Sequence, residues 1–218
     1  MEFYRLKTVI VNQDQDRMVP GKKCPPSRGL LFGKKGENKM KLYVIGGKAK
    51  SGKNTFGKFL REELKEYGYK PCVMHLTTPL YSYAENYFEW NEHSDEKPRE
   101  FLQKMGVEII KEKLGKKTFL LDRLSEDIEI LSEFFDTFII VEARLKKEFD
   151  YLKSKYKDVV SIRLTRENYQ STLSETEKAH ITENDLDDFE EFDYDITSSG
   201  IVELKEMAKA IVNEEEGE

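Results

Sequence analysis

The sequence predicts an α/β fold built around a parallel, twisted sheet. Short apolar segments typical of buried strands alternate with segments whose apolar residues recur at helical spacing, and a glycine-rich loop joins the first such pair. A chain of 218 residues is long enough to bury one substantial core. We therefore expect one main domain with appendages.

The expected elements follow one another from Met40 onward. Residues 42–45 form a first strand, and Phe56, Leu60 and Leu64 then share one face of a helix that Gly68 ends. We expect further strands at 72–76, 137–142 and 159–164, and further helices at about 80–90, 98–114, 119–134, 146–156 and 201–213.

Residues 1–39 differ from the rest of the chain in charge and in pattern. They carry nine Lys/Arg and four acidic residues, a net charge of +5, whereas the other 179 residues carry −11 and bring the whole chain to −6. Proline and glycine recur there without a helical or strand period. We expect 1–39 to be a poorly ordered basic extension and 40–218 to be the folded domain. The acidic domain argues against nucleic acid as a partner.

A phosphate-binding motif follows the first strand. GKAKSGK at 47–53 fits the pattern GxxxxGK between a strand and a helix, where backbone N–H groups wrap phosphate oxygens and Lys53 reaches the β- and γ-phosphates. Asn54 stands where a Ser or Thr usually follows the lysine, so the hydroxyl expected to bind Mg²⁺ together with ATP is that of Thr55. The predicted ATP-binding residues are Gly47, Lys48, Ala49, Lys50, Ser51, Gly52, Lys53, Asn54 and Thr55.

The loop SGKNT at 51–55 resembles the SGKDT loop of phage and bacterial deoxynucleoside monophosphate kinases and the GKGT loop of adenylate kinases. Segments at 78–80 (TPL), 97–106 (KPREFLQKMG), 141–145 (VEARL) and 180–183 (HITE) are similar, in the same order, to family segments. The resemblance covers residues 41 to about 212. It implies an adenylate-kinase-like, three-layer α/β/α fold with a mostly parallel five-stranded sheet and a short lid at about 165–188.

The same resemblance implies transfer of the γ-phosphoryl group of ATP, with Mg²⁺, to a (deoxy)nucleoside monophosphate. Arg99 and Gln103, four residues apart on one helix face, would bind the acceptor together with Glu142 and Arg144 at a strand end. Lys53, Arg144 and Arg166 would act in catalysis. The alternatives are a surface pair for Arg99 and Gln103, an ion pair between Glu142 and Arg144, and a solvated charge for Arg166.

Other features exclude several classes of function. No apolar run approaches the ~20 residues of a membrane-spanning helix. Cys24 and Cys72 lie far apart, and no histidine has a partner at metal-ligand spacing, which argues against a disulfide framework and against protein-held zinc. We expect a cytoplasmic protein that binds small-molecule nucleotides and not membranes; a homodimer is compatible with this interpretation. Two alternatives stay open: another small-molecule kinase, such as a dephospho-coenzyme A or phosphomevalonate kinase, and a non-catalytic ATP-binding regulatory module.

Overall fold

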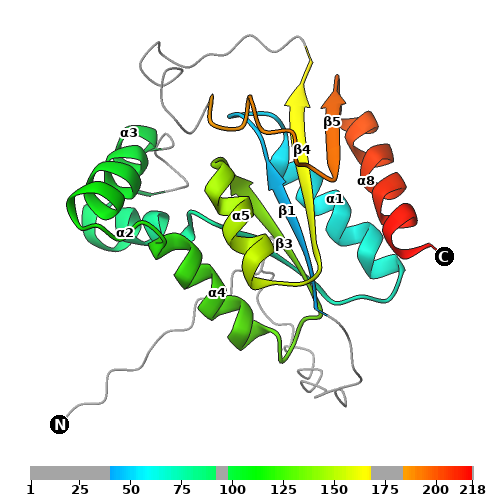
Figure 1. Ribbon diagram of the computed structural model, residues 1–218, viewed down its shortest axis with the longest axis horizontal. Helices are drawn as coiled ribbons and strands as arrows, with labels where there is room; N and C mark the ends of the chain where they lie inside the picture. The colour runs from blue at the N-terminus through cyan, green and yellow to red at the C-terminus, as the bar shows by residue number, and fades with distance from the viewer. Residues whose placement is uncertain (1–39, 92–97, 168–183, 218) are drawn as a thin grey trace, which may run out of the picture. The chain divides into compact units, whose positions relative to one another are not determined.

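A computed structural model describes residues 40–91, 98–167 and 184–217 of the protein (Figure 1). The strands are β1 (Lys41–Gly46), β2 (Pro71–His75), β3 (Thr137–Ala143), β4 (Val159–Arg166) and β5 (Tyr194–Ser198). The helices are α1 (Lys53–Glu66), α2 (Thr78–Phe88), α3 (Arg99–Gln103), the π-helix η1 (Lys104–Lys113), α4 (Phe119–Leu131), α5 (Lys146–Lys155) and α8 (Ile201–Glu216). The expected extension at 1–39 lies outside the described residues.

The five strands form one parallel sheet in the order β2-β3-β1-β4-β5. Leu42 of β1 pairs with Phe138 of β3 on one side and with Val159 of β4 on the other, so the first strand lies in the middle of the sheet. All five carboxyl ends meet at one edge because the strands are parallel. This arrangement confirms the predicted α/β fold with a five-stranded parallel sheet.

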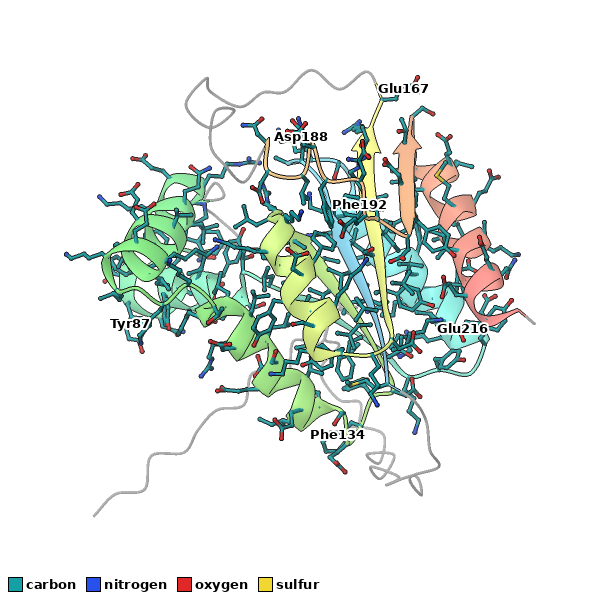
Figure 2. The ribbon with its side chains drawn as sticks, viewed as in Figure 1. Tyr87, Phe134, Glu167, Asp188, Phe192 and Glu216 are labelled. Atoms are coloured by element: carbon teal, nitrogen blue, oxygen red, sulfur yellow. The ribbon has the colours of Figure 1, made fainter. Side chains whose placement is uncertain are left out.

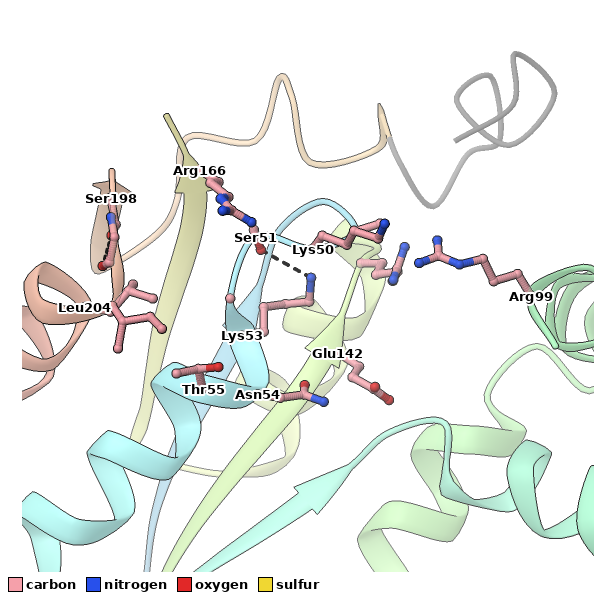
Figure 3. A pocket seen from close by; sticks show the side chains of 15 residues that line it. Lys50, Ser51, Lys53, Asn54, Thr55, Arg99, Glu142, Arg166, Ser198 and Leu204 are labelled. Atoms are coloured by element: carbon pink, nitrogen blue, oxygen red, sulfur yellow. Dashed lines mark hydrogen bonds between the residues drawn. The ribbon is translucent and has the colours of Figure 1, made fainter. Parts of the chain in front are cut away.

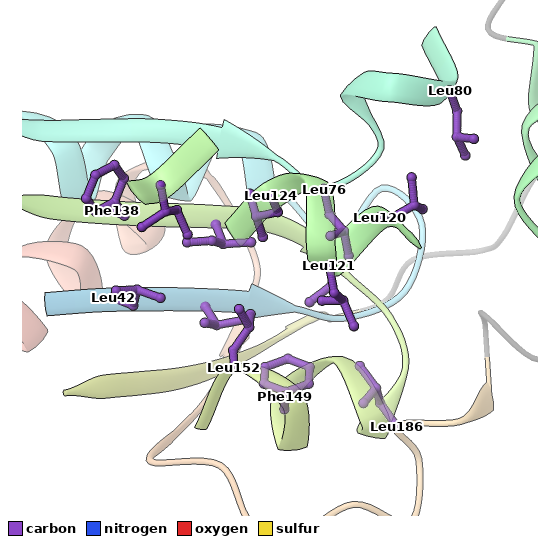
Figure 4. Close-up of a cluster of buried hydrophobic side chains, with 14 of the residues drawn as sticks. Leu42, Leu76, Leu80, Leu120, Leu121, Leu124, Phe138, Phe149, Leu152 and Leu186 are labelled. Carbon is purple, nitrogen blue, oxygen red and sulfur yellow. The ribbon is translucent and has the colours of Figure 1, made fainter. Parts of the chain in front are cut away.

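Helices cover both faces of the sheet, as the predicted three layers require. Along β1, Leu42 and Val44 point to one face and Tyr43 and Ile45 to the other, and all four side chains are buried. The first face packs against α2, η1, α4 and α5, including Phe149 (Figure 4). The second face packs against α1 and α8. Because both faces are buried, the sequences of these strands are continuous apolar runs and do not alternate with polar residues.

The helix after the glycine-rich loop has the boundaries that the sequence predicts. Gly52 precedes its first turn with a φ of 100°, a left-handed conformation that glycine adopts without strain. At the other end Gly68 has a φ of 89° and donates its N–H to the carbonyl of Lys65. Tyr69 donates to the carbonyl of Leu64, so the last turn closes in the manner of a Schellman motif.

One expectation about secondary structure is corrected, and one strand that the sequence pattern did not locate is added. The region 98–114 is not one regular helix: α3 ends at Gln103, and a π-helix continues from Lys104 to Lys113. The apolar spacing of this short segment predicts a helix, but it does not distinguish i→i−4 from i→i−5 hydrogen bonding. The fifth strand also has a position, Tyr194–Ser198, that the sequence pattern did not locate.

Most of the expected lid, at about 165–188, lies outside the described residues. The structure describes the chain up to residue 167 and again from residue 184. After that gap Leu186 and Phe189 are buried in the core on the α5 side. Arg163 of β4 donates to the carbonyl oxygens of both residues, at 3.2 Å in each case, and pairs with Asp195. Its guanidinium also lies over the ring of Phe192. Arg163 therefore holds the returning chain against the sheet.

A polar cluster fixes the C-terminal helix at the amino end of the strands. Glu216 accepts hydrogen bonds from Lys41 (2.7 Å), Tyr43 (3.0 Å) and Tyr69. It lies at the far end of the sheet from Glu167, which follows β4 (Figure 2). Burial raises the pKa of Glu216, but the hydrogen bonds from Lys41 and the two tyrosines outweigh burial and leave this pKa below its usual value.

Candidate active site

The glycine-rich loop between β1 and α1 has the backbone geometry of a phosphate-binding loop. Gly47, Lys50 and Gly52 all have positive φ angles, of 131°, 60° and 100°. A Cβ on Gly47 would lie 2.3 Å from the carbonyl oxygen of Leu164 in β4, so glycine is required there by both conformation and space. The loop leads directly into α1, whose N-terminus carries a partial positive charge.

Lys53 lies at the start of α1 with its charged group inside the loop. The side chain is 6% exposed, and Nζ donates to the carbonyl oxygens of Gly47 (2.8 Å) and Lys48 (2.6 Å). Nζ also lies 3.3 Å from Ser51 Oγ (Figure 3). The ammonium group is therefore placed where loops of this kind bind phosphate oxygens.

A cavity of about 490 Å³ opens beside this loop at the carboxyl edge of the sheet. Most of the sequence-predicted site residues line it: Ala49, Lys50, Ser51, Gly52, Lys53, Asn54, Thr55, Arg99, Glu142, Arg144 and Arg166. Segments that are far apart in the sequence therefore form one site, as the parallel topology predicts for the carboxyl ends of strands.

Three other predicted residues do not line this cavity. Gly47 contributes its carbonyl oxygen, which accepts a hydrogen bond from Lys53 Nζ. The Lys48 side chain turns away and forms an exposed ion pair with Asp187, at 2.8 Å. Gln103 is half-buried at the end of α3 and is absent from the lining residues, whereas Arg99, one helical turn earlier, is present. A role for Gln103 in acceptor binding stays a prediction.

Arginines reach the cavity from three separate elements. Arg99 begins α3 and extends toward the loop, Arg166 ends β4 on the other side of the loop, and Arg144 follows β3 (Figure 3). Together with Lys50 and Lys53 they concentrate positive charge in a domain whose net charge is negative. Such a site attracts anions with several negative charges.

The backbone at Arg144 is held in place by Glu148. One oxygen of the Glu148 carboxylate accepts the N–H groups of Arg144 (2.9 Å) and Leu145 (3.1 Å), which closes the first turn of α5. The other oxygen lies 3.7 Å from Nζ of Lys111 in η1, whose pKa is lowered by burial. The π-helix and the Arg144 turn are thus linked through one buried carboxylate.

Glu142 has a strained backbone at the carboxyl end of β3. Its φ is 75°, and the pairing of β3 with β1 shifts by one residue between Ile140 and Ala143. Such a conformation costs about 1–3 kcal/mol for a residue other than glycine. The side chain is 10% exposed; it accepts a hydrogen bond from Thr77 Oγ1 and lies 3.7 Å from His75 Nδ1.

The oxygen atoms of the site suit Mg²⁺ shared with a bound nucleotide. Thr55 and Glu142 both line the cavity, and hydroxyl and carboxylate oxygens are ligands that Mg²⁺ accepts beside phosphates. Within the described residues, no group of three or more His, Cys, Asp or Glu side chains is arranged to hold a metal ion. Thr55 and Glu142 are thus the residues that would hold a Mg²⁺ ion beside bound phosphates.

Four lining residues were not predicted, and all lie at the junction of β5 and α8. Ser198, Gly200, Ile201 and Leu204 complete the cavity beside Gly52, and the Ile201 side chain is 67% exposed. Ser198 Oγ donates to the carbonyl of Gly200 at 2.9 Å, which shapes the turn. Locating the fifth strand in the sequence would have indicated them, because its carboxyl end must reach the same edge of the sheet.

The parallel sheet and the loop around Lys53 define a P-loop α/β fold. No family model and no curated protein matches the chain. Among solved structures, the chain is similar to shikimate kinase from Bacteroides thetaiotaomicron, with 13% identity and a TM-score of 0.48 over 81% of this chain and 99% of that one. It is also similar to APS kinase from Mycobacterium tuberculosis in complex with AMPPNP and APS, with 12% identity and a TM-score of 0.46 over 80% and 96% of the two chains.

None of the helices in the described residues is both long and apolar enough to cross a membrane.

Proposed function

We propose that this protein is a kinase that transfers the γ-phosphoryl group of ATP to a (deoxy)nucleoside monophosphate. The observation that carries the proposal is the single cavity in which the P-loop lysine and arginines from three elements meet. A P-loop alone binds the phosphates of a nucleotide. Arginines placed opposite the loop are suited to a second anion and to the charge that spreads over the oxygens during transfer.

We assign each side chain a role that its place in the cavity supports. The loop backbone and Lys53 bind the donor phosphates, since Lys53 Nζ already faces the interior of the loop. Arg99 and Arg144 bind the acceptor phosphate, and Arg166 at the end of β4 stabilises the phosphoryl group in transfer. Mg²⁺, when bound by the nucleotide, would neutralise phosphate charge. Catalysis of this kind consists of alignment and charge stabilisation, so the chain needs no covalent nucleophile.

The choice of a nucleoside monophosphate as acceptor has two supports. One is the colinear resemblance to deoxynucleoside monophosphate kinases, in particular KPREFLQKMG at 97–106. The other is that Arg99, which that resemblance assigns to the acceptor, lies in the cavity with the loop. The guanidinium groups of Arg99 and Arg144 can each bind a phosphate through two parallel N–H groups.

The test is a panel of acceptors with coupled detection of ADP. The purified protein, with ATP and Mg²⁺, is given each deoxynucleoside and ribonucleoside monophosphate in turn and then a set of non-nucleotide alcohols and phosphates. We expect saturable ADP release with at least one nucleoside monophosphate. Release with non-nucleotide acceptors alone would identify a different small-molecule kinase, and tight ATP binding without turnover would identify a regulatory module.

A matched pair of lysine variants tests the site itself. Lys53→Met removes the ammonium inside the loop and is expected to lower kcat by roughly 10²–10³-fold, the usual cost of one preorganised charge-stabilising group. Lys58→Met changes an exposed lysine on the same helix and should leave kcat unchanged. Equal activity of the Lys53→Met and wild-type proteins would refute the proposed role of the loop.

A further inference from the structure

The turn between β2 and α2 carries two adjacent threonines with different tasks. Thr78 Oγ1 donates to the carbonyl of His75 at 2.9 Å and is exposed, so it only closes the local turn. Thr77 Oγ1 instead donates across to the carboxylate of Glu142, a residue 65 positions later in the chain. The Thr77 hydroxyl therefore links α2 to the wall of the candidate active site.

Thr77 stands at a position where threonine usually has another role. It is the N-cap residue of α2, and an N-cap hydroxyl normally accepts a hydrogen bond from an N–H of the first turn. In this helix no side-chain hydrogen bond caps the N-terminus. This hydroxyl donates to Glu142, so it links α2 to β3 and not to the first turn of its own helix.

The contact is made to a residue, Glu142, whose backbone is strained. Its φ of 75° lies in the left-handed region, and its strand pairing is irregular there. The turn containing Thr77 is fixed relative to β3, since Leu76 donates its N–H to the carbonyl of Val141 at 3.3 Å. Thr77 is thus a rigid donor beside a strained acceptor.

We propose that Thr77 is a positioning residue that orients the Glu142 carboxylate toward Mg²⁺ and the phosphates in the cavity, an inference that rests on the proposed function. The Thr77 hydroxyl binds Oε2, and His75 Nδ1 lies 3.7 Å from Oε1. Glu142 and Asn54 extend toward the same side of the loop (Figure 3). Groups that hydrogen-bond a metal-directed carboxylate typically change metal affinity or activity by about 10–100-fold when removed.

The experiment compares three variants with the wild-type protein. Thr77→Val removes the hydroxyl and keeps the shape, Thr77→Ser keeps the hydroxyl, and Thr78→Val is the matched control in the same turn. Isothermal titration calorimetry measures binding of a non-hydrolysable ATP analogue with and without Mg²⁺. Steady-state assays with the best acceptor of the panel then give kcat, KM and the Mg²⁺ concentration for half-maximal rate.

We expect Thr77→Val to weaken Mg²⁺-dependent binding of the analogue, or to raise the half-maximal Mg²⁺ concentration, by about tenfold, with Mg²⁺-free binding unchanged. Thr77→Ser and Thr78→Val should behave like wild type. Equal Mg²⁺ dependence of Thr77→Val and Thr78→Val would overturn the inference, as would failure of Thr77→Ser to restore it.

The outcome for the proposed function is read separately. If the wild-type protein binds Mg²⁺ and the analogue but transfers no phosphoryl group, the proposed kinase function is refuted. The calorimetric comparison of the variants then still tests the role of Thr77. A wild-type protein that binds no nucleotide refutes both.

Discussion

Gly47→Ala is the substitution whose effect the structure defines most sharply. Gly47 has a φ of 131°, and a Cβ there would lie 2.3 Å from the carbonyl oxygen of Leu164 and 3.1 Å from Ser51 Oγ. The first contact is with backbone, which cannot rotate away as a side chain does. The loop and β4 must therefore separate if alanine is to fit.

The magnitude is the sum of two terms. A non-glycine residue at positive φ costs about 1–2 kcal/mol, and forcing packed backbone apart costs a further ~1–3 kcal/mol. Gly68→Ala provides the control: its φ of 89° carries the first term, and no atom lies within 4 Å of its Cβ position. The loss of unfolded-state entropy is the same in both variants and cancels. We expect Gly47→Ala to be less stable than Gly68→Ala by about 1–3 kcal/mol.

Urea denaturation of both variants measures this difference in the free energy of unfolding. Isothermal titration calorimetry measures how each substitution changes the affinity for ATP. Moving the loop takes its N–H groups out of position, so Gly47→Ala should also bind ATP at least ~10-fold more weakly, a cost of about 1.4 kcal/mol. Gly68 lies beyond the far end of α1 and its variant should keep wild-type affinity. Equal urea midpoints for the two variants would refute the steric argument.

Three further predictions concern single side chains. Folding lowers the pKa of Glu216 below its ordinary 4.5, so its contacts stabilise the folded protein above that pH. This stabilisation is lost as the pH falls through the lower folded-state pKa. Melting temperatures from pH 7 to 3 should therefore fall more steeply for wild type than for Glu216→Gln, and parallel curves would contradict this. Arg99→Ala should raise KM for the acceptor by about 10–100-fold and KM for ATP much less, since one charged hydrogen-bonding group is lost. Initial-rate kinetics measure both constants. An equal rise of the two would contradict a role of Arg99 in acceptor binding. Glu148→Ala uncaps α5 and should lower the free energy of unfolding by about 1–2 kcal/mol, whereas urea curves of the exposed-residue control Asp150→Ala should match wild type.

The fold was largely predictable because burial on both faces leaves a clear mark on a parallel strand. Residues 42–45 and 137–142 are nearly continuous apolar runs, and both are central strands. The edge strand β5 lacks this mark, because in YDITS only Ile196 and Ser198 are buried. The π-helix was missed for a different reason: over ten residues the apolar spacing predicts a helix but not which hydrogen-bond register the helix has.

The site was predictable where the sequence carries a local motif and less so where it depends on topology. The loop at 47–53 is a local motif with a known geometry, and Glu142 and Arg144 could be placed because strand ends meet at one edge. Ile201 and Leu204 were missed together with β5. The Thr77 contact has no sequence signal, because it joins residues 65 positions apart that share no motif.

The place of β1 in the middle of the sheet also constrains how the protein is made. Both neighbours of β1 come much later in the chain, from Thr137 and from Val159 onward, and the last wall of the cavity begins at Ser198. During synthesis the loop motif leaves the ribosome early but has no partner strands to fix it, and such late pairing makes folding slow. Nascent chains arrested before α8 should thus contain the whole P-loop sequence and still lack the binding site.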